Sequence, residues 1–276
     1  MTVLTLARDG IGGAVLEVDA DSSVEAWAAA LDGVDAVIHL AAIAHRTPEV
    51  DVLASVNVDW PVRLFEAAIR AGVADFVFLS SIKVFGDRSV RPFKVSDPYA
   101  PDDAYGESKV RAEQALRTLQ ADHPEIRLAI LRSPLVYGPG VKANFRTLLA
   151  WAARGSRGWL LPFGAARAPR SLISVRNLSE AIVACFGRRG VFHCADASDL
   201  SVAQVFGALG VPSWRLLPVP AGLMRLLLTL IGSGAYYQRL YEPLQLDTGA
   251  SEAELDWSPR HSSEDALDLT MQWWRA

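Results

Sequence analysis

A buried strand followed by a helix that carries a tyrosine and a lysine constrains this chain most. Residues 76–81, Phe-Val-Phe-Leu-Ser-Ser, form an uncharged run that ends in hydroxyl groups, as a buried strand does. Residues 105–116 have helical spacing, so Tyr105 and Lys109 share one helix face about a turn apart. An ammonium near a phenol favours the phenolate, and such a tyrosine exchanges a proton near neutral pH. Ser81, at the carboxyl end of the strand, is positioned to hydrogen-bond the same substrate oxygen.

These segments resemble motifs of the extended short-chain dehydrogenase/reductase family, which includes sugar-nucleotide epimerases, dehydratases and reductases. Residues 80–86, Ser-Ser-Ile-Lys-Val-Phe-Gly, resemble the serine strand of that family, and the Tyr-x-x-x-Lys motif resembles its catalytic pair. Residues 131–140 resemble the strand and loop beside the nicotinamide. The resemblance implies that Ser81, Tyr105 and Lys109 are catalytic. An ordinary exposed pair on a helix is the alternative for an isolated Tyr-x-x-x-Lys.

Strands alternate with helices through the first half of the chain. Apolar runs at 3–8, 14–19 and 34–42 predict strands, and residues 24–31 and 56–72 have helical spacing. This alternation predicts an α/β fold with a parallel sheet and helices on both faces.

The resemblance makes that fold more specific. It implies a Rossmann-like doubly wound sheet, with a dinucleotide-binding domain over residues 1–140. Residues 141–276 are expected to form mainly a sugar-nucleotide-binding region, a smaller α+β substrate domain from which some segments return to the Rossmann core.

The glycine-rich loop that follows the first strand of such a fold does not occur in the sequence. A glycine cluster at 10–13 comes after a strand that ends at Arg8. We therefore interpret residues 3–8 as the second strand of the family, residues 14–19 as the third, and the glycine cluster as a surface turn. On this interpretation the domain is N-terminally truncated. A chain that starts at Met1 is expected to be poorly stable and to bind NAD(P) weakly, since the pyrophosphate loses its helix N-terminus.

The resemblance also implies a set of cofactor-binding residues. Asp19 matches the aspartate that contacts adenine, and Asn57 matches an asparagine near the start of the next helix, although a cap and a turn are alternative roles for them. Arg8 suits a 2′-phosphate, so the cofactor is expected to be NAD or NADP. The implied set is Arg8, Asp19, Leu40, Ala41, Ala42, Asn57, Tyr105, Lys109, Pro134 and Val136.

Segments in the second half resemble those that hold the nucleoside diphosphate of a sugar nucleotide. Arg170 matches an arginine on the diphosphate, for which its planar fork is suited, and a surface ion pair is the alternative. The implied substrate-binding residues are Lys83, Ser133, Asn144, Phe145 and Arg170. Residues 81–84, 92–98, 140–145 and 170–172 resemble the bacterial UDP-N-acetylquinovosamine dehydrogenases. Those enzymes reduce a UDP-4-keto-6-deoxy-N-acetylhexosamine in O-antigen (lipopolysaccharide) synthesis.

The resemblance therefore implies an NAD(P)-dependent oxidoreductase that acts at C4 of a UDP-sugar. Lys83 stands where dehydratases carry an Asp-Glu pair, which disfavours 4,6-dehydration. Reduction of a 4-keto sugar is the first expectation. A UDP-sugar 4-epimerase uses the same tyrosine, lysine and serine and remains open. The alternative that is not an enzyme is a non-catalytic sugar-nucleotide binder or a degraded copy.

Charge, cysteine content and hydropathy limit the binding partners and the cellular compartment that we expect for this chain. A net charge of -4 gives no electrostatic reason to expect nucleic acid. Cys185 and Cys194 provide neither a disulfide framework nor metal-ligand spacing, which fits a reducing cytoplasm, and no signal peptide opens the chain. The apolar run 223–231 is too short for stable membrane insertion and is predicted to pack on the core, with membrane contact as a minor alternative. The family's helix-bundle interface implies a possible homodimer.

Overall fold

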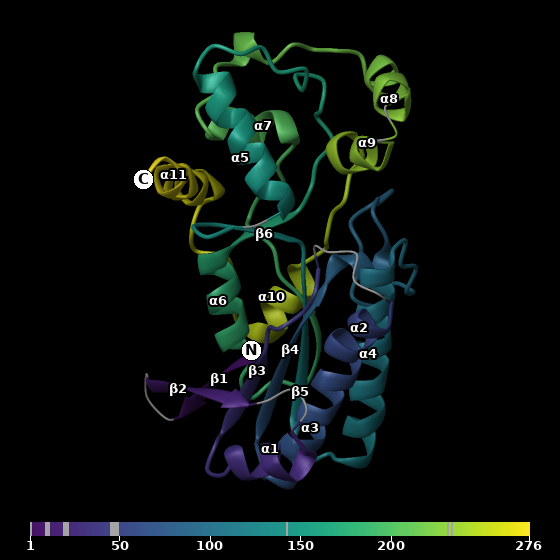
Figure 1. The fold of residues 1–276 in the computed structure, drawn as a ribbon, viewed down its shortest axis with the longest axis vertical. Helices are drawn as coiled ribbons and strands as arrows, with labels where there is room; N and C mark the ends of the chain where they lie inside the picture. The colour runs from purple at the N-terminus through teal and green to yellow at the C-terminus, as the bar shows by residue number, and fades with distance from the viewer. Residues whose placement is uncertain are drawn as a thin grey trace.

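The chain folds into a sheet-based lobe and a second, mainly helical lobe (Figure 1). The structure is a computed structural model that describes residues 2–8, 12–18, 22–44, 50–141, 143–230, 232 and 234–276. For residues 2–8, 12–18, 50, 51, 143, 144 and 235 it describes the backbone alone.

A six-stranded sheet with the order β2-β1-β3-β4-β5-β8 forms the first lobe. In that order the strands are β2 Gly12–Val18, β1 Thr2–Arg8, β3 Ala36–His39, β4 Asp75–Ser81, β5 Arg127–Ser133 and β8 Gly190–His193. The four neighbours β3, β4, β5 and β8 run parallel, which confirms the predicted α/β fold. Because parallel strands end at the same edge, Ser81 and Ser133 lie opposite one another at the carboxyl edge of the sheet.

The first two strands form an antiparallel hairpin, and β1 also runs antiparallel to β3. The prediction that they are the parallel second and third strands of the family is therefore wrong. Arg8 pairs with Gly12, so three residues connect the strands. That length permits a hairpin, whereas a parallel pair needs a crossover of about a dozen residues or more. Of the predicted turn at 10–13, Gly12 and Gly13 belong to β2, while residues 9–11 and Asp19 lie outside the described part.

Helices cover both faces of the sheet, because alternate residues of each strand point to opposite sides. Phe76 and Phe78 of β4 face one set of helices: α1 Val24–Ala30, α3 Trp60–Arg70 and α4 Ala104–Asp122. Val77 faces the opposite set, α6 Val175–Ala184 and α10 Gly249–Leu255. The helix α2 Val50–Ala54 and the π-helical turn η1 Ser55–Asp59 lead into α3. Both cysteines are buried free thiols on the α6 side.

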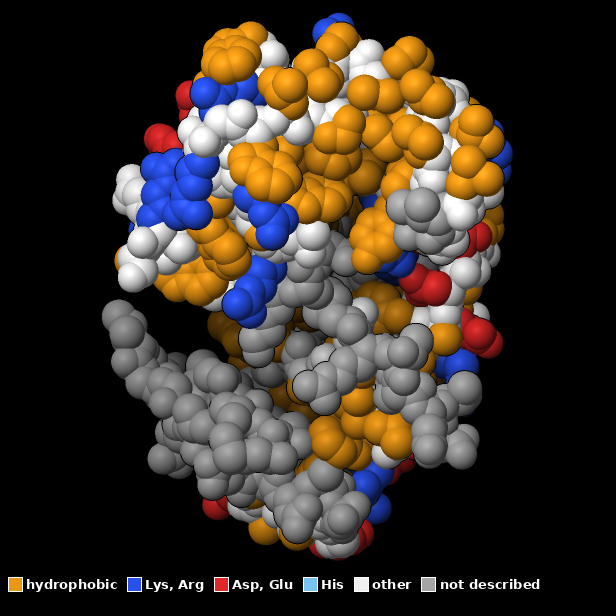
Figure 2. Space-filling model, turned by 45° about the horizontal axis from the view of Figure 1, so that its top comes forward, with side chains coloured by type: hydrophobic (Ala, Val, Ile, Leu, Met, Phe, Trp, Pro, Cys, Tyr) orange, Lys and Arg blue, Asp and Glu red, His pale blue; other side chains and the backbone are white. Residues whose placement is uncertain are grey.

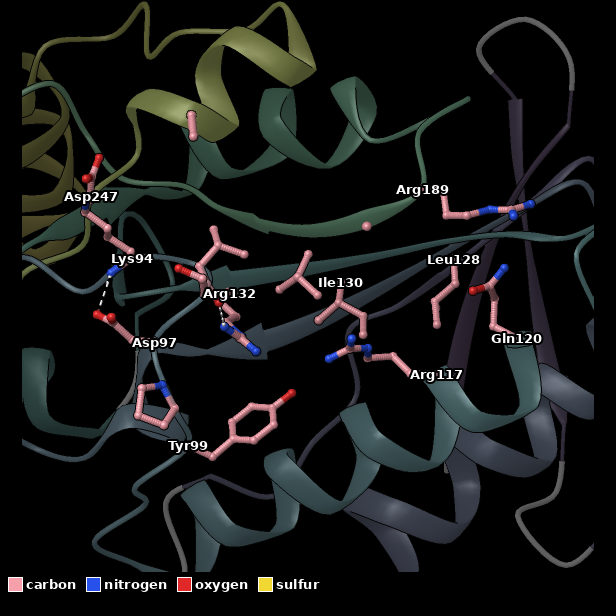
Figure 3. Close-up of a pocket in the computed structure, with 16 residues that line it drawn as sticks. Lys94, Asp97, Tyr99, Arg117, Gln120, Leu128, Ile130, Arg132, Arg189 and Asp247 are labelled. Carbon is pink, nitrogen blue, oxygen red and sulfur yellow. Dashed lines mark hydrogen bonds between the residues drawn. The ribbon is translucent and has the colours of Figure 1, made fainter. Parts of the chain in front are cut away.

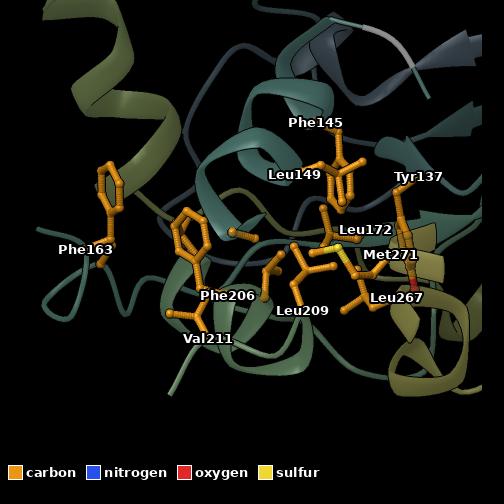
Figure 4. Close-up of a cluster of buried hydrophobic side chains, with 14 of the residues drawn as sticks. Tyr137, Phe145, Leu149, Phe163, Leu172, Phe206, Leu209, Val211, Leu267 and Met271 are labelled. Carbon is orange, nitrogen blue, oxygen red and sulfur yellow. The ribbon is translucent and has the colours of Figure 1, made fainter. Parts of the chain in front are cut away.

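A second lobe stands beyond the carboxyl edge of the sheet (Figure 1). Its helices are α5 Ala143–Ser156, α7 Val202–Ala208, η3 Ser213–Arg215, α8 Ala221–Leu230, α9 Gly234–Tyr241 and α11 Ser263–Arg275. They surround a separate apolar core that includes Phe145, Phe206 and Met271 (Figure 4). A two-stranded parallel ladder, β6 Leu135–Tyr137 and β7 Leu172–Ser174, joins the lobes. The 3-10 turn η2 Ile82–Phe85 follows β4.

Helix α8 does not pack as the sequence predicts. Met224 is buried, but Leu223, Leu226, Leu227 and Leu230 are between 47% and 73% exposed. Their spacing, i, i+3, i+4 and i+7, places the four leucines on one stripe of the helix. The predicted burial against the core is therefore wrong for this stripe. Within the described residues, none of the helices combines the length and the apolar character that crossing a membrane requires.

Candidate active site

Strand β4 and helix α4 bring the three predicted catalytic residues to one place. Ser81 is the last residue of β4, while Tyr105 and Lys109 occupy the first turns of α4. The Lys109 Nζ lies 6.0 Å from the centroid of the Tyr105 ring and 4.6 Å from that of Phe78. It donates a hydrogen bond of 2.9 Å to the carbonyl oxygen of Leu79. The lysine head is thus fixed between the strand and the tyrosine.

The start of α4 fixes the position of Tyr105. The Asp103 side chain caps the helix by accepting a hydrogen bond of 2.7 Å from the Gly106 amide. A Cβ on Gly106 would lie 2.5 Å from the carbonyl oxygen of Lys83, so the helix approaches that backbone as closely as only glycine allows. Lys83 in turn donates a hydrogen bond of 3.0 Å to the Asp103 carboxylate. Tyr105 is therefore held against the segment that follows Ser81.

The electrostatics differ from the simple expectation for a Tyr-Lys pair. Burial raises the pKa of Tyr105 to about 12, a hydrogen bond with Ser81 opposes this rise, and the Asp103 carboxylate adds to it. Burial lowers the pKa of Lys109 to about 8, and the nearby Glu113 carboxylate opposes that shift. The predicted lowering of the Tyr105 pKa by Lys109 is thus wrong for this arrangement, because desolvation is the larger effect. Near neutral pH the site holds a neutral phenol beside an ammonium.

A buried ion pair lies beneath the catalytic residues, and the sequence interpretation missed it. Glu113, one turn beyond Lys109, pairs with Arg132 at 2.6 Å, and both side chains are almost fully buried. The carboxylate also accepts hydrogen bonds from the hydroxyls of Ser80 and, at 2.7 Å, Tyr99. An arginine that directly follows the apolar run 128–131 of β5 is the sequence signal for such a partner. The network ties α4 to β4 and β5 directly behind Ser81.

The loop that follows β3 is held by Asn57. Its amide oxygen accepts a hydrogen bond of 2.8 Å from the Ile43 amide, and its nitrogen donates to Ile43 and to Ser108. Asn57 therefore positions the predicted cofactor loop from within the protein. In that loop Leu40 and Ala42 are exposed and Ala41 is half-buried.

His39, the last residue of β3, is a second residue that the sequence interpretation missed. Its ring stacks on Phe78 with centroids 5.8 Å apart, and its Nε2 is buried without a hydrogen-bond partner among the described residues. Burial, with the charge of Lys109, lowers the pKa of His39 to about 3, so the imidazole is neutral. A histidine that ends an apolar strand beside the catalytic lysine was the available signal.

Three cations gather where the second lobe meets the end of β4. Arg170 donates a hydrogen bond of 2.6 Å to the carbonyl oxygen of Glu242. Burial, with repulsion from Arg239, lowers the pKa of Arg170 to about 10. Burial also lowers the pKa of Lys83, and both arginines contribute to that shift although Asp103 opposes it. Arg239, on α9, was not predicted. The carboxylates of Asp87, Asp103 and Glu242 lie beside these cations, so the three form part of a cluster of mixed charge.

The remaining predicted residues fall into three groups. Ser133 is buried at the end of β5, and Pro134 and Val136 follow it at the carboxyl edge. Phe145 is fully buried and stacks on Tyr137 at 5.4 Å, which restricts its predicted substrate contact to the backbone (Figure 4). The side chains of Arg8, Asp19 and Asn144 lie outside the described part.

A cavity of about 870 Å³ opens on the far side of the Glu113–Arg132 pair. Arg117 of α4 and Arg132 of β5 point toward one another across it (Figure 3). None of the three predicted catalytic residues lines this cavity. Two of its charged groups are paired within the protein, Arg132 with Glu113 and Asp97 with Arg91. We therefore place the active site at the carboxyl edge of the sheet and not in this cavity.

Comparison with known proteins identifies the family of the chain. The sequence profile of the NAD dependent epimerase/dehydratase family matches residues 4–191. The chain belongs to this family. It is 36% identical over 252 residues to the UDP-glucose 4-epimerase of Vibrio cholerae, covering 86% of this chain and 75% of that protein.

A second relative and a solved structure extend the comparison. The N-acetyl-alpha-D-glucosaminyl-diphospho-ditrans,octacis-undecaprenol 4-epimerase of Escherichia coli O157:H7 is 31% identical over 208 residues, 71% of this chain and 61% of that protein. The fold matches the crystal structure of UDP-N-acetylglucosamine 4-epimerase from Bacillus cereus with a TM-score of 0.75 at 18% identity. That match covers 94% of this chain and 85% of the other. These relatives do not single out the quinovosamine dehydrogenases.

The site of this epimerase/dehydratase family member fits one end of a dinucleotide. Lys109, Tyr105 and the His39 Nε2, which has no hydrogen-bond partner among the described residues, lie together at the carboxyl edge, where the nicotinamide half of NAD needs polar groups. The pyrophosphate end is different. In the part of the chain that the structure describes, β1 leads into β2, so no helix N-terminus follows β1 to receive phosphates. The fit is therefore to the catalytic half of the cofactor.

Proposed function

We propose that this chain is an NAD-dependent enzyme that acts at C4 of a UDP-sugar as a 4-epimerase. The observation that carries the proposal is the convergence of Ser81, Tyr105 and Lys109, with the lysine head fixed by the Leu79 carbonyl. The identity to the Vibrio cholerae UDP-glucose 4-epimerase supports the choice of reaction. When bound, NAD supplies the acceptor and donor of hydride for C4 of the sugar.

The protein supplies proton transfer and alignment. Oxidation at C4 would release the O4 proton to Tyr105 in its phenolate form, and Tyr105 would return that proton to O4 when C4 is reduced, while Ser81 orients the oxygen. Burial makes the neutral phenol the main form of Tyr105 in the chain alone, so the Lys109 ammonium is proposed to stabilise the phenolate that the reaction needs, and to bind the nicotinamide ribose. The residues that would hold the cofactor at this end are Leu40, Ala41, Ala42, Tyr105, Lys109, Pro134 and Val136, with Asn57 holding their loop.

The substrate diphosphate is proposed to lie against Lys83, Arg170 and Arg239. Asp87 and Asp103 pair with Lys83, and the Glu242 carboxylate acts on Arg170, so the diphosphate would add to the carboxylates around the two guanidinium groups. These planar groups match phosphate oxygens in pairs. Ser133 lies opposite Ser81 at the carboxyl edge of the sheet and is proposed to contact the sugar.

Reduction of a UDP-4-keto-6-deoxy-N-acetylhexosamine is the second candidate. The motif resemblance at 81–84 and 170–172 favours it, and it uses the same three catalytic residues. The two reactions differ in their net use of cofactor, because an epimerase returns the hydride to the same sugar while a reductase consumes NADH or NADPH.

The test is to incubate the purified chain separately with UDP-glucose and with UDP-N-acetylglucosamine in the presence of NAD, and to follow the C4 configuration by NMR. We expect the C4 epimer without net NADH formation. A Tyr105→Phe variant with unchanged circular dichroism should turn over about 10² to 10⁴ times more slowly. Consumption of NADH or NADPH with the 4-keto sugar alone would select the reductase. Full activity of Tyr105→Phe would remove both candidates.

A further inference from the structure

The outer end of the second lobe exposes many large apolar side chains. Figure 2 shows hydrophobic side chains spread over this end of the molecule. Trp159 and Trp214 are 65% and 67% exposed, and the four leucines of the α8 stripe are exposed with them. We call this surface the apolar end. It comprises Trp159, Leu160, Trp214, Leu217, Leu223, Leu226, Leu227, Leu230 and Tyr236.

Backbone hydrogen bonds hold the parts of the apolar end side by side. The Leu161 amide donates to the Arg215 carbonyl at 2.8 Å, and the Leu217 amide donates to the Leu161 carbonyl at 2.8 Å. These bonds fix the Trp159 segment against the Trp214 segment. Helix α8 follows η3 after a connection of five residues and packs on α9, where the Arg225 guanidinium lies 5.8 Å from the centroid of the Tyr237 ring. The apolar end thus has two supported parts, the Trp159 and Trp214 segments and the α8 stripe, both on the outer side of the second lobe (Figure 1).

The segments that form the apolar end carry positive charge only. Residues 143–168 and 200–241 contain seven arginines and no aspartate or glutamate, although the whole chain has a net charge of -4. The seven are Arg146, Arg154, Arg157, Arg167, Arg215, Arg225 and Arg239. Apolar exposure and an excess of arginine therefore occur together in these two segments, whereas the acidic side chains among the helices of the second lobe, Glu264, Asp265 and Asp268, lie on α11.

We propose that the apolar end docks on an anionic membrane surface, with α8 lying in the plane of the interface. A helix with exposed leucines along one stripe and arginine among them matches the pattern of interfacial helices. Tryptophan rings and arginine side chains are suited to the headgroup level, where one part of the side chain is apolar and another polar. At ten residues, α8 lies on a bilayer and does not cross it.

Charge favours lipid over a second copy of the chain as the occupant. Two apolar ends facing one another would bring arginines together without carboxylates to pair with them, which costs free energy. Anionic lipid headgroups supply the missing negative charge. The docking surface lies on the far side of the second lobe from the sheet (Figure 1), so docking leaves the catalytic residues uncovered. The inference stands apart from the proposed reaction.

The apolar contribution is tested by flotation of the full chain with vesicles of phosphatidylcholine, with and without phosphatidylglycerol. We expect binding to the anionic vesicles that weakens as salt is added. The triple variant Leu226→Ser, Leu227→Ser, Leu230→Ser should bind at least about tenfold more weakly, since its side chains no longer enter the acyl region. The matched control, Val90→Ser with Val183→Ser, replaces exposed valines outside the apolar end and should bind like the unaltered chain.

The charge contribution is tested with Arg157→Gln combined with Arg225→Gln. Each charge removed should weaken binding to anionic vesicles about fivefold, with little effect on neutral ones. Arg88→Gln, an exposed arginine of the other lobe, is the control. Circular dichroism and turnover of a soluble UDP-sugar verify that each variant is folded. Absence of vesicle binding by the unaltered chain would overturn the proposal. Two other results would also overturn it: an oligomer of the unaltered chain that the leucine variant dissociates, and capture of an acidic protein in place of lipid.

Discussion

Lys109 is a residue whose burial opposes folding. Its side chain is almost fully buried, and burial lowers the pKa of Lys109 from 10.5 to about 8. Between these values the unfolded chain binds the additional proton, so the free energy of unfolding rises with pH across this window. The penalty is fully present below pH 8 and disappears near pH 10.5. The site therefore retains an ammonium that folding alone would not favour.

The substitution Lys109→Met tests this cost. At pH 7 we expect the free energy of unfolding to increase by up to about 3 kcal/mol, the free-energy equivalent of that pKa shift, while turnover falls steeply. Urea denaturation at pH 7 and pH 10 measures the change, and the gain should shrink at the higher pH. A loss of stability at pH 7 would mean that the hydrogen bond to Leu79 outweighs desolvation.

At the residue scale, local rules predict which side chains meet but not the environment around them. The helical spacing of Tyr105 and Lys109, and the position of Ser81 at a strand end, follow from period alone. The pKa of Tyr105 depends on how far the rest of the protein buries its side chain. Phe145 is likewise buried by residues that are distant from it in sequence. The motifs in which Tyr105 and Phe145 occur therefore predict neither the pKa of the one nor the burial of the other.

At the scale of elements, the Glu113–Arg132 pair secures α4 against the sheet. Glu113→Gln leaves the buried Arg132 charge without its partner, and we expect a loss of about 3–5 kcal/mol of unfolding free energy. The matched control is Glu25→Gln, which breaks the exposed pair with Arg70 and should leave stability unchanged. Thermal denaturation of both variants gives the comparison. Equal effects would show that the buried network does not anchor α4.

The N-terminal hairpin shows why strand pairing is harder to predict than strand location. Both strands were located from their apolar runs, but the family resemblance assigned them a parallel arrangement. The short, glycine-containing connection between Arg8 and Gly12 was the signal for a hairpin. Pairing of β1 with β3 involves residues about thirty positions apart in sequence, for which no local pattern exists.

At the scale of the whole molecule, the two lobes are expected to hold different ligands. Arg170→Ala should weaken UDP-sugar binding by about 1–3 kcal/mol, the range for losing a charged hydrogen bond. NAD affinity should hardly change, because the cofactor residues lie on the sheet lobe. Calorimetric titration with each ligand measures both, and Arg167→Ala, an exposed neighbour, is the control. Equal weakening of both ligands would identify Arg170 as a structural residue.

The connection between the lobes has a consequence for how the molecule unfolds. The chain passes between the two lobes more than once. At their boundary the Tyr137 hydroxyl donates a hydrogen bond of 2.7 Å to the Asp196 carboxylate, and the Asn177 side chain donates one of 2.9 Å to the carbonyl oxygen of His261. Segments from several distant parts of the sequence thus interlock at the boundary. Neither core can lose its structure without removing partners from the other. The two cores therefore form a single cooperative unit, despite being separate in space.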